Sequence, residues 1–267
     1  MLITSSESFS KRLLVGIPMT GLIRAEWAMG RWNQIIPCNF ALTDCIQWID
    51  QNTPLGFLVA DARNIVVHHA IKGGFEWLWF IDQDVVLPQG TLIHYNDCMI
   101  KGDVPVIGGL YFTKSVPSEP LVYRGRGNGY YDKWNIGDKV WVDGMGMGCT
   151  LIHTSILKVM YEECEEYKCR DMKIKKVFET PRRMWFDPEY NTWRLAIGTE
   201  DLDWCNRVIE GNVLERAGWK KFQKKKYPFL IDTRIFCKHI DNDGIQYPSR
   251  GEEFQFMRVK ENVSNSK

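Results

Sequence analysis

Residues 77–84 read Trp-Leu-Trp-Phe-Ile-Asp-Gln-Asp, five apolar residues followed directly by an Asp-x-Asp motif. A short apolar run this dense in aromatic residues is typical of a buried strand. The sequence therefore predicts a strand over 77–81 that ends at Asp82 and Asp84.

The segments before and after this strand alternate between apolar runs and helical patterns. Apolar runs at 13–18 and 55–59 predict two further strands, each followed by a segment with helical spacing. Pro88 and Gly102 then mark the start and end of a third helix. Three strand–helix units in the first hundred residues predict a parallel α/β sheet covered on both faces. Ligands bind such sheets beyond the carboxyl ends of the strands, where the two acids would lie.

The second half of the chain has a less regular pattern. The segment 170–197 is rich in charged and aromatic residues without a sustained period, which is compatible with a mobile lid. An amphipathic helix is expected from 199 to about 211. The remaining expected elements are short strands at 104–107, 121–123, 139–142 and 149–153, the last leading into a helix over 154–168.

Composition and charge exclude several classes of protein. The 34 basic residues nearly balance the 33 acidic ones, so no overall field favours nucleic acid or an anionic membrane. No apolar run reaches the 18 or so residues of a membrane span, and the first eight residues do not resemble a signal peptide. The eight cysteines contain no Cys-x-x-Cys pair, which is typical of reduced thiols and gives no support to a zinc site. These features predict a soluble cytoplasmic protein with no integral membrane segment.

Asp-x-Asp occurs three times in the chain, but only Asp82 and Asp84 directly follow an apolar strand. Carboxylate oxygens are the ligands that Mg²⁺ and Mn²⁺ prefer, and such cations bridge to diphosphate oxygens. The alternative is a strand-to-turn junction at which aspartate accepts hydrogen bonds from the backbone. Taken alone, the motif leaves both interpretations open.

Several further motifs follow in a fixed order along the chain. Together with 82–85 they resemble the GT-A glycosyltransferases, in particular the family 2-like branch of bacteria, archaea and their phages. The resemblance spans about residues 12 to 240. The segments that carry it are Ala62-Arg63-Asn64, 108–112 (GGLYF), 143–149 (DGMGMGC), 198–205 (GTEDLDWC) and Cys237-Lys238-His239.

This resemblance implies a fold and an activity. The fold would be α/β, with a Rossmann-like, mostly parallel central sheet flanked by helices and a mixed acceptor-side region toward the C-terminus. One domain would span 1–267, with a nucleotide-binding half over about 12–110, a catalytic half over about 111–245 and a frayed tail over 255–267. The activity would be metal-dependent, inverting transfer of a sugar from a UDP- or GDP-sugar to a hydroxyl of a glycan, lipid, protein or modified DNA base.

The resemblance also assigns metal ligands. Asp84 would be the principal ligand of Mn²⁺ or Mg²⁺, and Asp82 would face the metal or the ribose. His239 would be a further ligand from the C-terminal region, and an imidazole ligand favours Mn²⁺ over Mg²⁺.

The catalytic base implied by the resemblance is Asp201, preceded by Glu200. Inverting transfer needs a carboxylate that takes the acceptor proton. The alternative is purely structural, because Thr199 is a natural N-cap and acids in a first turn favour the helix dipole. Asp203 would orient the base or lie on the surface.

Besides Asp82, five residues are candidate contacts to the donor. Pro18 and Thr20 lie in the loop after the first strand, where base and ribose would bind. Asp61 would contact the base or ribose, and Arg63 would bind phosphate oxygens in bidentate geometry, or else cap a helix or pair with Asp61. Gly146 would let the backbone pass close to the donor sugar, or simply relax a bend.

Competing interpretations concern the acceptor and the reaction. Trp185 and Trp193 could stack on an acceptor sugar or base. The five lysines within Lys220–Lys226 could bind DNA, although such clusters are more often solvated loops. A sugar nucleotidyltransferase would carry a longer Gly-rich basic loop after the first strand, which 16–22 lacks. A non-catalytic module that binds nucleotide or nucleic acid is the other alternative.

Overall fold

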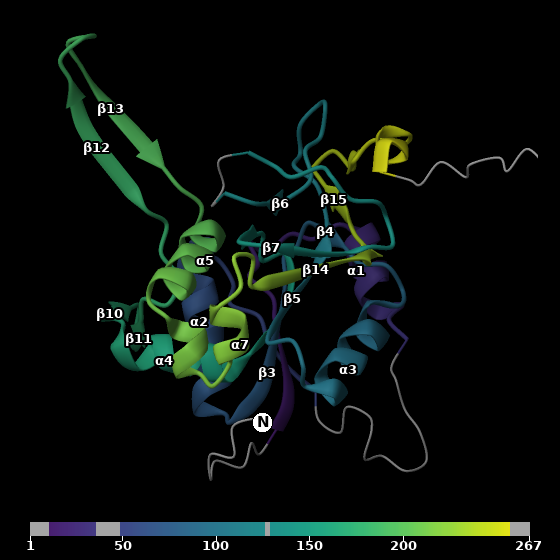
Figure 1. Cartoon of the computed structure of the whole chain (residues 1–267), viewed down its shortest axis with the longest axis horizontal. Coiled ribbons are helices and arrows are strands. Elements are labelled where there is room, and N and C mark those ends of the chain that lie inside the picture. The colour runs from purple at the N-terminus through teal and green to yellow at the C-terminus, as the bar shows by residue number, and fades with distance from the viewer. Residues whose placement is uncertain (1–10, 36–48, 126–128, 257–267) are drawn as a thin grey trace, which may run out of the picture.

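The computed structural model describes residues 11–35, 49–125 and 129–256. Its centre is a seven-stranded sheet (Figure 1). In spatial order the strands are β2 (Ile49–Asn52), β1 (Lys11–Gly16), β3 (Phe75–Ile81), β9 (Cys149–His153), β5 (Val106–Leu110), β14 (Phe229–Phe236) and β7 (Lys139–Val142). Five of them run in one direction, while β9 and β7 run against their neighbours. The predicted mostly parallel sheet is thereby confirmed.

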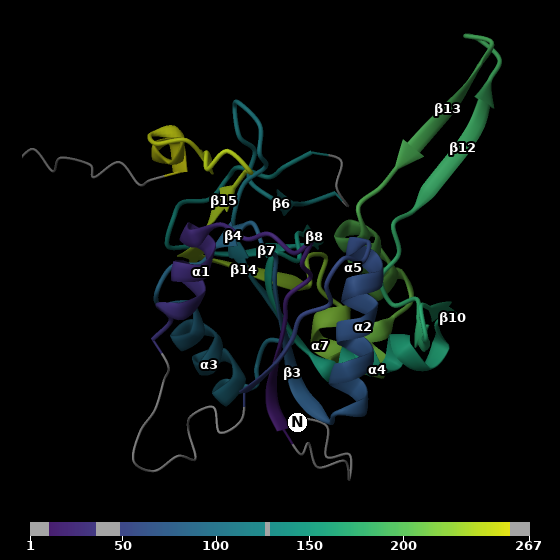
Figure 2. The same ribbon diagram turned by 180° about the vertical axis from the view of Figure 1, so that it is seen from behind.

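Helices cover both faces of the sheet (Figures 1 and 2). On one face lie α1 (Ala25–Trp32) and α3 (Thr91–Lys101). The other face carries α2 (Val59–Lys72), α4 (Thr154–Glu163), α5 (Glu200–Glu210) and the short α6 (Val213–Arg216) and α7 (Lys220–Gln223).

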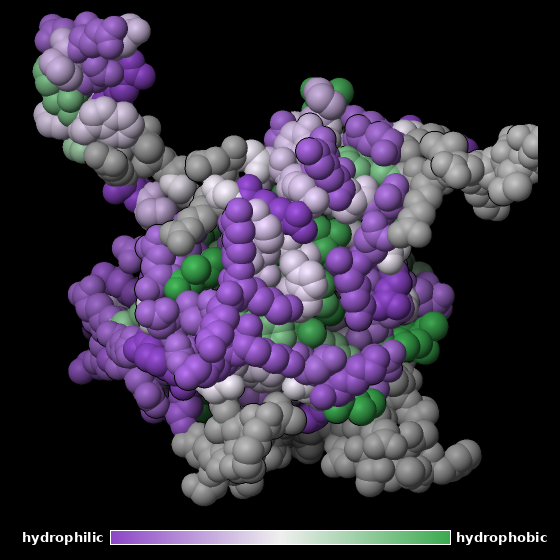
Figure 3. All heavy atoms as spheres, in the orientation of Figure 1, coloured by the Kyte–Doolittle hydropathy of each residue, from purple (hydrophilic) through white to green (hydrophobic). Residues whose placement is uncertain are grey.

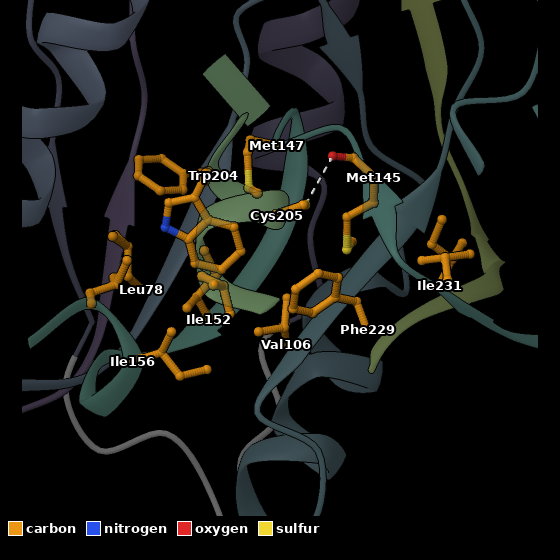
Figure 4. Close-up of a cluster of buried hydrophobic side chains, with 14 of the residues drawn as sticks. Leu78, Val106, Met145, Met147, Ile152, Ile156, Trp204, Cys205, Phe229 and Ile231 are labelled. Carbon is orange, nitrogen blue, oxygen red and sulfur yellow. Dashed lines mark hydrogen bonds between the residues drawn. The ribbon is translucent and has the colours of Figure 1, made fainter. Parts of the chain in front are cut away.

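The aromatic strand β3 is buried on both sides, as a central strand of a doubly covered sheet must be. Trp77 and Trp79 pack toward α1 and α3, whereas Leu78 and Phe80 pack toward the helices of the opposite face. Figure 4 shows the second cluster, in which Trp204 of α5 lies among residues of the sheet. From Trp77 to Ile81 the side chains alternate between the two cores, which fixes the register of β3 because a shift of one residue would exchange the faces.

Two boundaries differ from the sequence prediction. The run 55–59 is not a strand: the second strand is Ile49–Asn52, and Leu58 is 73% exposed just before α2 begins. Gly56 has a φ of +72°, which breaks extended pairing in this run. The helix predicted over 154–168 ends at Glu163. The chain then turns at Arg170 and forms the two-stranded β10 (Glu166–Cys169) and β11 (Met172–Lys175).

The segment 170–197, in which the sequence shows no sustained period, contains a regular hairpin. Strands β12 (Arg182–Asp187) and β13 (Thr192–Ile197) pair along their full length and project from the body as a ribbon (Figures 1 and 2). The ribbon exposes aromatic side chains, including Trp193 at 64% and Trp185 at 38%. The main-chain N–H of Gly198 donates to the carbonyl of Pro181 at its base, immediately before α5.

Two smaller sheets complete the arrangement around the carboxyl ends of the central strands. One contains β16 (Gln246–Tyr247), β15 (Lys238–Ile240) and β4 (Val85–Val86), and the other pairs β6 (Val122–Tyr123) with β8 (Gly144–Met145). A 3-10 helix over Glu252–Phe256 follows.

Within the described ranges no helix is long and apolar enough to cross a membrane. Six of the eight cysteines lie in these ranges, and all six are free thiols. Cys38, Cys45 and most of the tail expected to fray lie outside the described residues.

Candidate active site

The backbone around the Asp-x-Asp motif is held by three hydrogen bonds. Antiparallel pairing of Ile81 with Cys149 brings Asp82 opposite Gly148, whose carbonyl accepts the Asp82 N–H at 2.9 Å. The indole N–H of Trp27 donates to the Asp82 carbonyl at 2.7 Å, and the N–H of Val85 donates to the same oxygen at 3.1 Å. The turn that carries Asp82 and Asp84 is therefore fixed to α1 and β9.

The side chain of Asp82 turns toward Arg63 of α2. Arg63 is only 2% exposed, and its Nη2 lies 3.0 Å from Asp82 Oδ2 while its Nε lies 3.0 Å from Glu200 Oε1. Burial raises the pKa of the Asp82 carboxyl, although the nearby Arg63 charge opposes this shift. Arg63 was expected to contact phosphate, but here it links the end of β3 to the start of α5.

The side chain of Asp84 lies on the more open side of the turn, where it is 34% exposed. Its Oδ2 lies 2.5 Å from Lys114 Nζ and 3.4 Å from His239 Nε2. Although burial opposes it, these two neighbours lower the pKa of Asp84 to about 2. The main-chain N–H of Ile240 donates to the Asp84 carbonyl at 2.8 Å, which holds β15 beside the motif.

The ring of His239 is oriented by its second nitrogen. Nδ1 lies 2.7 Å from the carbonyl oxygen of Phe112, which can only accept, so Nδ1 carries the hydrogen. Nε2 then faces Asp84, and a backbone partner of this kind commonly orients metal-binding histidines. The ring also packs edge-on against Tyr111, with centroids 5.6 Å apart.

Within the described part of the chain, no three histidine, cysteine, aspartate or glutamate side chains are grouped as a ready metal cage. The donor types nevertheless fit Mn²⁺ or Mg²⁺ at Asp84 and His239. Mg²⁺ in particular is usually held by one or two carboxylates together with substrate phosphates. Asp82 Oδ1 is buried with no hydrogen-bond partner, so this oxygen could also serve as a ligand.

A glycine segment separates the acids of the motif from those of α5. A Cβ atom on Gly148 would lie 3.0 Å from Asp82 Oδ2, and one on Gly146 would lie 3.4 Å from Asp201 Oδ2 and 2.1 Å from the Tyr111 hydroxyl. Only glycine leaves room for this approach. The backbone of this segment therefore passes close to both acidic groups, while an approach of Gly146 to a donor sugar stays a prediction.

Tyr111 is a central residue that the sequence analysis did not single out. Its hydroxyl accepts the N–H of Gly148 at 2.8 Å and is buried. Burial, reinforced by the charges of Asp82 and Asp201, raises its pKa well above the usual value. The only sequence signal for it was its place after the paired glycines 108 and 109.

The α5 acids have different surroundings. Glu200 is buried against Arg63. Asp201 Oδ1 instead accepts a hydrogen bond of 2.8 Å from the main-chain N–H of the neighbouring Leu202. Burial, and then the charge of Glu200, raise the pKa of Asp201. Thr199 occupies the N-cap position, but no side-chain capping bond from it to the helix is present. Asp203 lies 3.6 Å from Arg207 one turn along the helix.

The remaining candidates are only partly brought to this site. Thr20 reaches it through Gln83, whose amide oxygen accepts the Thr20 N–H at 2.6 Å. Pro18 is buried at the end of the preceding run. Asp61 accepts the Tyr167 hydroxyl at 2.6 Å, so its carboxylate is engaged away from Asp84.

The lysine cluster has partners within the chain. Lys220 lies 3.1 Å from Glu215, and Lys225 Nζ lies 3.4 Å from the centroid of the Trp141 ring. Figure 3 shows mainly hydrophilic residues over α4 and α7 on this face. DNA binding by Lys220–Lys226 stays a prediction.

No protein-family model and no curated protein matches the chain. Among solved structures, A197 from STIV aligns over 88% of this chain and 88% of that chain, with a TM-score of 0.50 and 15% identity. The chain has a GT-A-like fold. This similarity concerns the fold alone, because identity is so low.

Two weaker structural similarities are to TarS of S. aureus. Each covers 55% of this chain at 12% identity with a TM-score of 0.33, one for TarS and one for TarS 1-349 in complex with UDP. They cover 29% and 48% of those chains, respectively. Scores this low do not establish a shared fold.

Proposed function

We propose that the chain transfers a sugar from a nucleoside-diphosphate donor to an acceptor hydroxyl, with inversion at the anomeric carbon. The observation that carries the proposal is the link Asp82–Arg63–Glu200, in which both contacts are 3.0 Å. It holds the acids after β3 and the acids of α5 on either side of the glycine segment. A metal-bound diphosphate on one side and an acceptor on the other would suit this spacing.

Asp84 and His239 would hold Mn²⁺ or Mg²⁺, with diphosphate oxygens completing the coordination. When bound, the cation neutralises charge on the leaving nucleoside diphosphate. The contact of Nδ1 with the Phe112 carbonyl fixes the ring so that Nε2 faces Asp84, and the lowered pKa of Asp84 favours its ionised form.

Asp201 would act as the general base. Its carboxylate takes the proton of the acceptor hydroxyl while that oxygen attacks the anomeric carbon and the bond from carbon to phosphate oxygen breaks. A base works best when its pKa approaches the working pH, and the surroundings of Asp201 shift its pKa in that direction. Glu200 and Arg63 would hold this carboxylate in position.

The first test is a thermal-shift screen of UDP, GDP and their sugars with and without Mn²⁺. A ligand at about 100 times its Kd adds roughly 2.7 kcal/mol to the free energy of unfolding, which raises Tm by several degrees. We expect a Mn²⁺-dependent shift with at least one nucleotide, and its loss in Asp84→Ala.

Asp243→Ala is the matched control, because Asp243 belongs to the third Asp-x-Asp and lies in an exposed turn capped by Asp241. It should keep the shift. Turnover then separates reaction classes: release of free nucleoside diphosphate supports transfer. Formation of pyrophosphate from a nucleoside triphosphate would instead identify a nucleotidyltransferase.

A further inference from the structure

The ammonium group of Lys114 occupies the position at which a cation would meet Asp84. Lys114 Nζ and His239 Nε2 approach the same carboxylate oxygen, at 2.5 and 3.4 Å. A divalent cation bound by Asp84 and His239 would need that oxygen and that nitrogen. The ammonium and the metal ion therefore compete for one place.

The backbone that carries Lys114 is held at both ends. The N–H of Thr113 donates to Glu119 at 2.8 Å, and that of Leu121 donates to Tyr111 at 3.0 Å. At the tip, the Ser118 hydroxyl donates to Glu252 at 2.5 Å. Only the flexible stem of Lys114 is left to move, so a displaced ammonium stays within a side-chain length of the site.

We propose that Lys114 serves as a counter-cation that alternates between two partners. In the free protein it neutralises Asp84, and when the divalent cation takes that carboxylate, the ammonium moves to the diphosphate. A lysine suits this exchange because it is a compact charge on a long stem with three rotatable donors. The inference rests on the proposed function, since it requires a metal-bound diphosphate at Asp84.

The exchange predicts effects of opposite sign in Lys114→Met. Removing a competing positive charge should tighten binding of Mn²⁺ alone by about fivefold, as expected for a partly exposed ion pair. Binding of pyrophosphate in saturating Mn²⁺ should weaken by about tenfold, because one charge-assisted hydrogen bond is lost. Both constants are measurable by calorimetry, with Mn²⁺ also followed by electron paramagnetic resonance.

Two further variants separate this role from a structural one. Lys173→Met removes a lysine that is 79% exposed on β11, and neither constant should change. Lys114→Arg keeps the charge and should change each constant less than Lys114→Met does, although its planar guanidinium is not equivalent to the ammonium. A loop that merely needs Lys114 for its shape would show losses of the same sign for metal and pyrophosphate.

The outcomes distinguish the two proposals. If wild type binds Mn²⁺ through Asp84 but Lys114→Met leaves either constant unchanged, or lowers both affinities, the exchange is wrong and the proposed function stands. If neither wild type nor Lys114→Met binds Mn²⁺ or Mn²⁺–pyrophosphate, the metal-dependent function itself fails, and this inference fails with it.

Discussion

Replacing Asp201 with asparagine is expected to lower the rate of sugar transfer by about 10²–10⁴-fold, the usual contribution of a general base. Asparagine keeps the shape of the side chain and can still accept the Leu202 N–H. It cannot take the acceptor proton. Binding of the donor with Mn²⁺ should therefore remain close to that of the wild type, so the loss appears in kcat.

The pH dependence provides a second readout for Asp201. Burial and the neighbouring Glu200 raise the pKa of Asp201, and the base must be ionised to act. Activity of the wild type should therefore fall as the pH drops through this raised pKa. The residual activity of Asp201→Asn should lack that limb.

Asp203→Asn is the matched control for this experiment, because Asp203 lies in the same first turn and its pKa is also raised by burial. It contacts Arg207 and should retain most activity. Normal turnover in Asp201→Asn, or a product with retained anomeric configuration, would rule out the assigned base.

Of the variants proposed here, Arg63→Met should cause the largest loss in the free energy of unfolding. Removing one member of a buried ion pair costs roughly 3–5 kcal/mol, because the partner charges remain buried without compensation. Here two carboxylates, of Asp82 and Glu200, would lose their common cation. A domain of this size should then unfold roughly 10 °C lower. Calorimetry or denaturant unfolding measures the change.

The pH dependence of the stability loss in Arg63→Met separates lost charge pairing from lost packing. Burial already raises the pKa of Asp82, and without Arg63 the main opposing charge disappears. Protonation of Asp82 would then relieve the buried charge, so the stability deficit of Arg63→Met should shrink as the pH falls from about 8 to 5. A packing defect would give a deficit independent of pH.

Arg24→Met is the comparison for Arg63, because Arg24 forms an ion pair with Glu26 in which both side chains are more than a third exposed. Solvent screens such an exposed pair, so its loss should change stability far less than the loss of Arg63. Equal losses in the two variants would contradict the view that Arg63 joins the two halves of the site.

The local sequence pattern was sufficient to predict the strands at the centre of the fold. The aromatic run 77–81 could be predicted as a strand because five consecutive apolar residues need cover on both faces. The boundaries Lys139–Val142 and Cys149–His153 agree with the structure because turn residues flank these short runs. The run 55–59 was wrongly predicted as a strand because Leu55 and Leu58 are exposed, at 54% and 73%, and Gly56 interrupts the extended backbone with a φ of +72°.

The sequence indicated which residues belong to the candidate site better than it indicated how their side chains are arranged. The strand-end position of Asp82 and Asp84 followed from chain order, but the direction of each side chain depends on distant residues. Arg63 is buried because α2 and α5 meet there, and Lys114 reaches Asp84 from a loop 30 residues away. Tyr111 also joins the acids only through tertiary packing. Such contacts have no periodic signature.

The proposed transfer depends on Asp84 and His239 holding a divalent cation against a diphosphate. The most direct measurement is anomalous diffraction from crystals soaked with Mn²⁺ and the nucleoside diphosphate that gives the largest thermal shift. We expect one strong manganese peak bonded to Asp84 Oδ2 and His239 Nε2, with Lys114 moved onto phosphate oxygens. Nucleotide bound elsewhere, or an ordered diphosphate beside Asp84 without a manganese peak, would rule out this cation site.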